Sequence, residues 1–219
     1  MTKKHLPSAA LFDLDGVLVD TEPVYTGIWR DIERTYPTGI EDFALKIKGN
    51  TLAQILDRYY PDEKIRHEVC RMLVERERDM EYPLFDGVMD FLEDLSRCGI
   101  PCVIVTSSND AKMQRLADSA PRFRSYFTAV ITDSCVTHSK PHPEPYLVGA
   151  ASVGADPAEC IVFEDSFAGM EAGRAAGAAV VGLATTNPRE SIVGKADAII
   201  DGFGGLTVAS LLEMLSEDD

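Results

Sequence analysis

The stretch Phe12–Leu18 reads FDLDGVL and follows the apolar run Ala9–Leu11. This short apolar run predicts a buried strand, so that two carboxylates, Asp13 and Asp15, come just after its end. If the extended geometry persists, the two side chains share one face, and Gly16 allows the chain to turn sharply. The stretch therefore predicts a place where an anion and a metal could bind, with a plain solvated turn as the alternative reading.

Two carboxylates this close to each other resist simultaneous ionisation unless a cation neutralises them. The pair therefore implies a raised pKa, a bound metal, or both. One carboxylate could act as a nucleophile while the other gives and takes a proton. Covalent catalysis on a substrate with a poor leaving group needs this division of labour.

The composition is that of an ordinary globular protein, with 219 residues, 45% hydrophobic and 26% charged. The formal net charge of −15 opposes binding to nucleic acid or to anionic membranes, so neither is expected as a partner. A small phosphorylated substrate remains possible, because a local cluster of metal, lysine and helix N-termini can outweigh the distant field. The first residues lack the apolar segment of a signal peptide, so we expect a cytoplasmic protein.

Residues 21–85 carry helical signals and no strand signal as far as Tyr82. Apolar residues recur every four positions after Pro23, and further helical patterns follow from Leu52 and from Ile65. We expect a helical insert whose two connections to the rest of the chain lie close together, so that it could move as a lid.

The rest of the chain, residues 1–20 and 86–219, alternates strand and helix patterns. Further strands are expected at Pro101–Thr106, Ala129–Thr132, Cys160–Phe163, Ala178–Leu183 and Ala198–Ile200. Helices are expected at Val88–Cys98, Asp110–Ala120, Pro145–Val153, Phe167–Ala176 and Leu206–Leu215. This alternation predicts an α/β fold, a Rossmann-like parallel-sheet core with an inserted helical cap domain.

In such a sheet, ligands bind outside the carboxyl ends of the strands. Asp13, Asp15, Thr106 and Asp165 all fall at that edge, and Lys140 lies in a loop with the right polarity. Four polar groups placed independently at one edge are much less expected by accident than any one of them.

The turn Thr106–Asn109 offers hydroxyls, backbone N–H groups and a helix N-terminus, which together make a good anion cradle. A plain helix cap is the competing interpretation, since Ser and Asn are common cap residues. Lys140 is held between a loop and a proline-initiated helix, so a functional role is more expected for it than for most surface lysines. The four histidines show no metal-ligand spacing, although His142 lies close to Lys140.

At this point the sequence resembles the haloacid dehalogenase superfamily of phosphohydrolases, in the branch with a helical cap inserted after the first motif. The likeness covers essentially the whole chain. Asp13-Leu14-Asp15-Gly16-Val17 resembles the first motif, Thr106 the second, Lys140 in KPHPEPY the third and Glu164-Asp165-Ser166 the fourth. The resemblance implies a Mg²⁺ site and an aspartyl-phosphate intermediate formed from a small phosphorylated substrate such as a sugar phosphate.

The family pattern also implies a role for each residue. Asp13 would be the nucleophile and Asp15 the acid, then the base. Asp13, the Asp15 backbone carbonyl and Asp165 would bind Mg²⁺, with Glu164 touching the ion directly or through water. Thr106, the Ser107 N–H and Lys140 would hold the phosphoryl oxygens. Apart from the family pattern, Ser108 and Asn109 of the same turn are further candidates for binding the substrate, and so are Gly49 and Asn50 in a cap loop that could equally be a solvated turn.

Three other functions are weighed against a phosphatase. A dehalogenase proper has no need for Asp15 or Mg²⁺, and a noncatalytic scaffold has no need for the intact set of motifs. A β-phosphoglucomutase shares all four motifs, but the mutases carry a histidine in the first cap helix where this chain has Tyr25. Histidine can bridge the closing cap to the acid–base carboxyl through two ring nitrogens, whereas tyrosine has a single hydroxyl. We therefore expect a phosphatase, with the mutase as the alternative.

Overall fold

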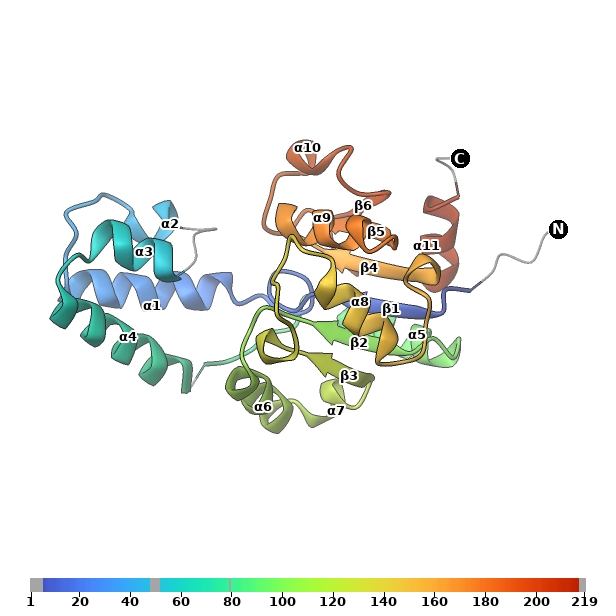
Figure 1. The fold of residues 1–219 in the computed structure, drawn as a ribbon, viewed down its shortest axis with the longest axis horizontal. Helices are drawn as coiled ribbons and strands as arrows, with labels where there is room; N and C mark the ends of the chain where they lie inside the picture. Colours follow the sequence, from blue (N-terminus) through green and yellow to red (C-terminus); the bar gives the residue numbers. More distant parts are fainter. Residues whose placement is uncertain (1–5, 48–51, 79, 217–219) are drawn as a thin grey trace. The chain divides into compact units, whose positions relative to one another are not determined.

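A computed structural model describes residues 6–47, 52–78 and 80–216, and it divides the chain into two compact units (Figure 1). The first unit contains Met1–Asp20 and Pro83–Asp219, and the second contains Thr21–Tyr82. Each unit has its own hydrophobic core and is described separately below.

The first unit is built on a six-stranded parallel sheet with the strand order β3-β2-β1-β4-β5-β6. The strands are β1 Ala9–Phe12, β2 Cys102–Val105, β3 Phe127–Ile131, β4 Cys160–Glu164, β5 Ala179–Leu183 and β6 Ala198–Ile200. The central strand β1 is paired on both sides, since Leu11 is in register with Val103 of β2 and with Val162 of β4. The predicted α/β fold with a Rossmann-like parallel sheet is confirmed.

The two faces of the sheet are covered by different helices because successive side chains of a strand point to opposite sides. Leu11, Val103 and Val162 lie in a core cluster with Tyr146 of α8 (Glu144–Ala151) and Met170 of α9 (Phe167–Ala175). The next residue of β1, Phe12, instead belongs to a group of aromatic rings on the other side, with Phe91, Phe127, Phe163 and Phe203. Phe91 comes from α5 (Val88–Arg97).

The remaining helical segments of this unit connect the strands or follow the last one. They are α6 Asp110–Ser119, α7 Pro121–Arg124, a 3₁₀ turn Asp133–Cys135, a second 3₁₀ turn Pro157–Glu159, α10 Arg189–Ile192 and α11 Val208–Met214. Sequence periodicity predicts the long helices to within a few residues, and it misses the three-residue and four-residue segments because these complete too few turns to show a period.

The second unit is entirely helical in its described part. It contains α1 Glu22–Thr35, α2 Phe43–Lys46, α3 Leu52–Tyr59 and α4 Glu63–Arg78 (Figure 1). Its core forms around Ile32 and Phe43, with the rings of Trp29, Tyr59 and Tyr60 packed edge-on against Phe43. The unit therefore has an apolar core of its own.

The two connections to the second unit run side by side within the first unit. Asp20 N–H donates to the carbonyl of Pro83, and Phe85 N–H donates to the carbonyl of Leu18. This pairing assigns Pro83 to Phe85 to the sheet unit, so the boundary falls after Tyr82 rather than after Phe85. The sequence pattern places it too late because these residues pair with a strand-like segment about sixty positions earlier.

Among the described residues, none of the helices combines the length and the apolar character that crossing a membrane would require.

Candidate active site

Asp13 directly follows β1 and its N–H still donates to the carbonyl of Phe163 in β4, whereas Asp15 lies in the tight turn that follows. β1 ends at Phe12, and both Leu18 N–H and Val19 N–H donate to the carbonyl of Leu14. The regular strand therefore ends before Asp15, and the shared face of the two side chains stays a prediction. Gly16 adopts φ +80°, the left-handed region that glycine enters without strain.

Lys140 is the charged centre of the site. Its ammonium lies 2.6 Å from Asp13 Oδ1, 2.7 Å from Glu164 Oε1 and 2.9 Å from the carbonyl oxygen of Val105, which it contacts at the end of β2. Burial alone would lower the pKa of Lys140, but the two carboxylates outweigh this effect and raise the pKa above its usual value. The lysine therefore stays charged and connects three strands at one edge of the sheet.

Glu164 is fully buried, and each of its oxygens accepts several hydrogen bonds. Oε1 accepts from Lys140 and from the hydroxyl of Tyr146, and Oε2 accepts from the N–H groups of Asp165 and Ser166 and from the Ser166 hydroxyl. Burial works to raise the pKa of Glu164, but Lys140 and these donors lower it overall. The carboxylate also packs where a Cβ on Gly169 would lie, which explains the glycine in the first turn of α9.

Asp13, Glu164 and Asp165 form a group whose carboxylate oxygens lie within 4.8 Å of one another. Burial raises the pKa of Asp13 well above its usual value, with Lys140 opposing and the neighbouring acids assisting. Burial likewise raises the pKa of Asp165 to about 7, with Glu164 as the next cause. Three carboxylates thus share one ammonium, and this excess of negative charge, made of hard oxygen donors only, fits a divalent cation such as Mg²⁺.

The turn after β2 contains four of the predicted site residues, and they do different things. Thr106 is buried, and its hydroxyl accepts the N–H of Ser108 at 3.0 Å. Ser108 Oγ donates to Asp15 Oδ2 at 3.0 Å, while Asn109 Oδ1 caps α6 by accepting the N–H of Lys112. The cap interpretation is therefore right for Asn109, and Ser108 contacts the second aspartate.

A cavity of about 160 Å³ opens beside this turn. Thr106, Ser107 and Lys140 are among the residues that line it. Asp133, Val136, Thr137, Ser139 and Pro145 complete its wall. The lining thus combines four hydroxyl residues and Lys140 with one acidic residue, Asp133.

Several residues that support the site are not predicted from the sequence. Thr185 Oγ1 donates to the carbonyl of Gly16, Thr186 hydrogen-bonds to the Asp165 carboxylate, and Asn187 donates to the Asp165 carbonyl at 2.9 Å. All three follow β5 at the carboxyl edge, which is the one signal that could have identified them. Lys112 is also missed, although its ammonium lies 2.7 Å from both oxygens of Asp15.

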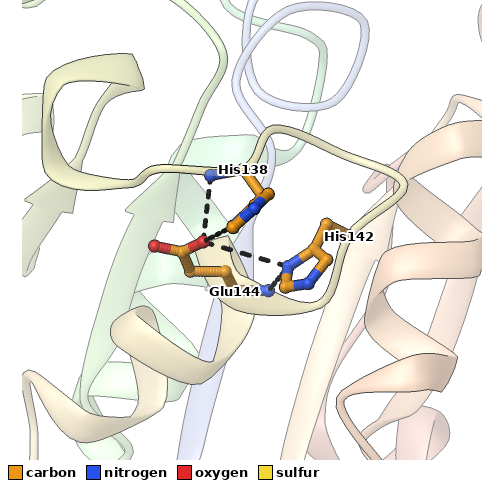
Figure 2. Close-up of side chains that lie close together, drawn as sticks. All are labelled: His138, His142 and Glu144. Carbon is orange, nitrogen blue, oxygen red and sulfur yellow. Dashed lines mark hydrogen bonds and ion pairs between the residues drawn. The ribbon is translucent and has the colours of Figure 1, made fainter.

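The loop around Lys140 is fastened by a second cluster, His138, His142 and Glu144 (Figure 2). Glu144 accepts the N–H of Thr137 at 2.8 Å, the N–H of His138 at 2.9 Å and a 2.8 Å bond from His138 Nδ1. These bonds, led by the one from Thr137, lower the pKa of Glu144 to about 2. His142 Nδ1 accepts the N–H of Glu144, so the cluster's donors and acceptors serve the loop itself.

Two of the predicted substrate residues, Gly49 and Asn50, lie outside the described residues. In the second unit, Tyr25 sits on α1 and its hydroxyl donates to Glu77 of α4 at 3.0 Å.

Comparison with known proteins supplies the family. The model of the haloacid dehalogenase-like hydrolase family matches residues 7–177. A fructose-1-phosphate phosphatase of Escherichia coli is 30% identical over 76% of this chain and 91% of its own length. A bifunctional riboflavin kinase/FMN phosphatase of Arabidopsis thaliana is 29% identical over 91% of this chain, which spans only 54% of that longer protein.

Solved structures have the same fold. A family IA hydrolase of Entamoeba histolytica superposes with a TM-score of 0.79 at 24% identity, covering 95% of this chain and 99% of that one. A β-phosphoglucomutase of Clostridium difficile gives 0.74 at 22% identity, covering 97% and 99%. With the family model matching most of its length, this chain belongs to the haloacid dehalogenase-like hydrolases.

Proposed function

We propose that the protein is a Mg²⁺-dependent phosphatase that hydrolyses a small phosphorylated metabolite through a phosphorylated Asp13. The observation that carries the proposal is the buried contact of Asp13 with Lys140, beside Glu164 and Asp165, at the carboxyl edge of the sheet. The relative that is a fructose-1-phosphate phosphatase supports a sugar phosphate as the substrate class.

Asp13 is the proposed nucleophile. Its carboxylate attacks phosphorus in line with the departing oxygen, which forms an acyl phosphate and releases the alcohol. Lys140 remains beside the attacking carboxylate, and together with Thr106 and the Ser107 N–H it holds the phosphoryl oxygens as their charge is redistributed. Thr106, Ser107 and Lys140 all line one cavity, which supports placing the phosphoryl group beside them.

Asp15 is the proposed acid–base residue. It protonates the leaving oxygen in the first step and then, as a carboxylate, takes a proton from the water that attacks phospho-Asp13. With its side chain one-third exposed, it can reach a substrate while its other contacts hold it in place.

Asp13, Asp165 and the backbone carbonyl of Asp15 would hold Mg²⁺, with Glu164 binding it directly or through water. When bound, the ion offsets the negative charge of the carboxylates and of the phosphoryl group. The many hydrogen bonds that Glu164 already accepts favour contact through water for that residue.

The helical unit 21–82 is proposed to be the cap that selects the substrate and excludes bulk water, with Gly49 and Asn50 as candidate contacts. The mutase alternative needs a residue in this unit that links cap closure to Asp15. Tyr25 has its hydroxyl engaged by Glu77, and this bond favours the phosphatase.

The test is turnover of a panel containing fructose 1-phosphate, hexitol phosphates, glycerol phosphate and FMN, with and without Mg²⁺. Asp13→Asn should lower kcat by several orders of magnitude, because a nucleophile acting within a covalent unit cannot be replaced by binding alone. Asp15→Asn should accumulate phospho-Asp13 with p-nitrophenyl phosphate, since this leaving group needs no acid while water attack still needs the base. Full activity of Asp13→Asn, or full activity in excess chelator, would refute the assignment.

The same preparation distinguishes the mutase. Purified protein is given β-glucose 1-phosphate with a trace of glucose 1,6-bisphosphate, and glucose 6-phosphate and free phosphate are followed together. A phosphatase releases phosphate at least as fast as it isomerises the sugar. Isomerisation about a hundredfold faster than phosphate release would replace the phosphatase by the mutase, because only a protected phospho-Asp13 could give that ratio.

A further inference from the structure

Lys112 is a buried lysine in the first turn of α6. The residue is 6% exposed, and its ammonium lies 2.7 Å from both carboxylate oxygens of Asp15. Lysine heads normally reach water, and a buried one is stable only beside a fixed partner of opposite charge. The contact with the Asp15 carboxylate therefore explains why this lysine can be buried.

The turn that carries Lys112 is held rigidly. Asn109 caps the helix through the N–H of Lys112 at 2.9 Å, and Asp110 accepts the hydroxyls of Thr132 and Ser134 beyond the end of β3 at 2.6 and 2.8 Å. Ser108 precedes the cap and donates to the same Asp15 carboxylate. One fixed turn thus supplies both the hydroxyl and the ammonium that contact Asp15.

The two buried lysines divide the carboxylates of the site between them. Lys140 contacts Asp13 and Glu164, and Lys112 contacts Asp15. The Asp15 side chain remains 33% exposed, whereas that of Lys112 is only 8% exposed. Asp15 is thus held from the protein side while part of it stays accessible.

We propose that Lys112 is a positioning residue for the reaction, acting through Asp15. It fixes the place and orientation of the carboxylate that must meet first the leaving oxygen and then the attacking water. This inference rests on the proposed function, because it assumes that Asp15 is the acid–base group. Misplacing a reacting group by about 1 Å can cost on the order of 100-fold in rate, so the anchor matters without touching the substrate.

The test is a double-mutant cycle with Lys112→Met and Asp15→Asn, in which kcat and KM are measured with a sugar phosphate. Lys112→Met should lower kcat by about 10- to 100-fold with KM within about 3-fold, because the chemistry and not the binding depends on the anchor. Lys112→Arg should recover a large part of kcat, since a guanidinium can hold both carboxylate oxygens. Lys195→Met, an exposed lysine on the loop before β6, serves as the control and should leave kcat unchanged.

The decisive arm uses the Asp15→Asn background, in which the rate of Asp13 phosphorylation by p-nitrophenyl phosphate is measured by rapid quench. Adding Lys112→Met there should change the rate by less than about 2-fold, because two residues acting as a unit are not additive. A loss of about 10-fold or more in the phosphorylation rate when Lys112→Met is added to Asp15→Asn would overturn the inference, because that loss cannot act through Asp15. A defect confined to KM, or a Lys112→Met kcat within about 3-fold of the parent, would overturn it as well.

Two further comparisons separate a failure of folding, or of the proposed function, from a failure of the inference. If Lys112→Met does not fold, Lys112→Arg and Lys112→Gln are compared, and equal kcat values for the two overturn the inference. If Asp15→Asn itself keeps full activity, the proposed function fails and not only the role of Lys112. A phosphatase that needs Asp15 but is indifferent to Lys112 would reject the positioning role alone.

Discussion

The ammonium of Lys140 lies 2.7 Å from the fully buried carboxylate of Glu164. The same nitrogen contacts Asp13. A single cation from a loop therefore links the ends of β1 and β4 through ion pairs, in addition to the backbone pairing of these two strands. We therefore expect both the stability of this sheet edge and the reactivity of Asp13, the proposed nucleophile, to depend on Lys140.

Lys140→Met should affect both properties. Removing one partner of a buried charge group leaves the others uncompensated, so urea unfolding should show a loss of about 3–5 kcal/mol. The folded fraction should also lose on the order of 10²- to 10³-fold in kcat, as when a group that stabilises transition-state charge is removed. Lys195→Met is again the matched surface control. A Lys140→Met protein with parental stability would contradict the proposed coupling.

Glu144 gives a pH dependence that can be measured separately from the chemistry. Its pKa in the folded protein is about 2, against an ordinary value of 4.5, so folding favours the ionised form. Its contribution to stability is therefore fully present above about pH 4.5 and is lost as the pH falls towards 2. The difference in unfolding free energy between the parent and Glu144→Gln should be largest at neutral pH and shrink below about pH 4.5.

The control for this prediction is Glu171→Gln, which removes the same charge from an exposed position on α9. Its difference from the parent, measured over the same pH range, is the baseline from which the Glu144→Gln difference is read. A Glu144→Gln difference that grows as the pH falls would contradict the assigned direction.

Much of the site could be predicted from the sequence because strand ends determine it. Asp13, Thr106 and Asp165 each directly follow a recognisable apolar strand, and a parallel sheet brings such ends to one edge. Lys140 comes from a loop, yet its proline-rich surroundings and the family pattern identify it.

The remaining contacts could not be predicted, because they depend on the directions of side chains from segments with no local signal. In the sequence, Lys112 does not differ from other helix lysines. Its contact with Asp15 depends on where α6 begins, which the cap at Asn109 sets. Thr186 lies in a loop, and Glu144 at the start of α8 accepts from the N–H of Thr137 in a loop; no periodicity describes the geometry of either loop. The turn that contains Asp15 also departs from regular strand geometry, and no alternation in the sequence indicates it.

Mg²⁺ should stabilise the protein more at pH 8 than at pH 6. Burial raises the folded pKa of Asp165 from 3.8 to about 7, so without metal this group lowers folding stability as the pH rises between those values. Below about pH 7 a bound ion must also displace the proton, which weakens its binding. Thermal unfolding with and without Mg²⁺ at the two pH values tests this, and Asp165→Asn should abolish the Mg²⁺-dependent shift. Equal shifts at both pH values would count against Asp165 as a ligand.

Gly16→Ala should lower kcat, whereas Gly99→Ala should not, because only the first substitution creates a side-chain overlap at the site. Both glycines have positive φ, +80° and +72°, so an alanine at either position strains the backbone by about 1–2 kcal/mol. A Cβ at Gly99 would meet open space, whereas one at Gly16 would overlap the Asp165 carboxylate and approach the Thr186 hydroxyl. Asp165 cannot move away freely, because its own N–H and that of Ser166 donate to the Glu164 carboxylate, and Asn187 donates to its carbonyl.

We therefore expect Gly99→Ala to lower the unfolding free energy by about 1–2 kcal/mol with kcat unchanged. Gly16→Ala should lose more stability than that, together with at least about 10-fold in kcat and most of the Mg²⁺-dependent thermal shift. The reason is that displacing Asp165 by even a fraction of an ångström disturbs the proposed metal ligands and the groups around Asp13. The measurements are urea unfolding, thermal unfolding with Mg²⁺ and turnover of the best substrate. If the two variants lost equal stability and both kept kcat, the close approach of Gly16 to Asp165 would have no bearing on the site.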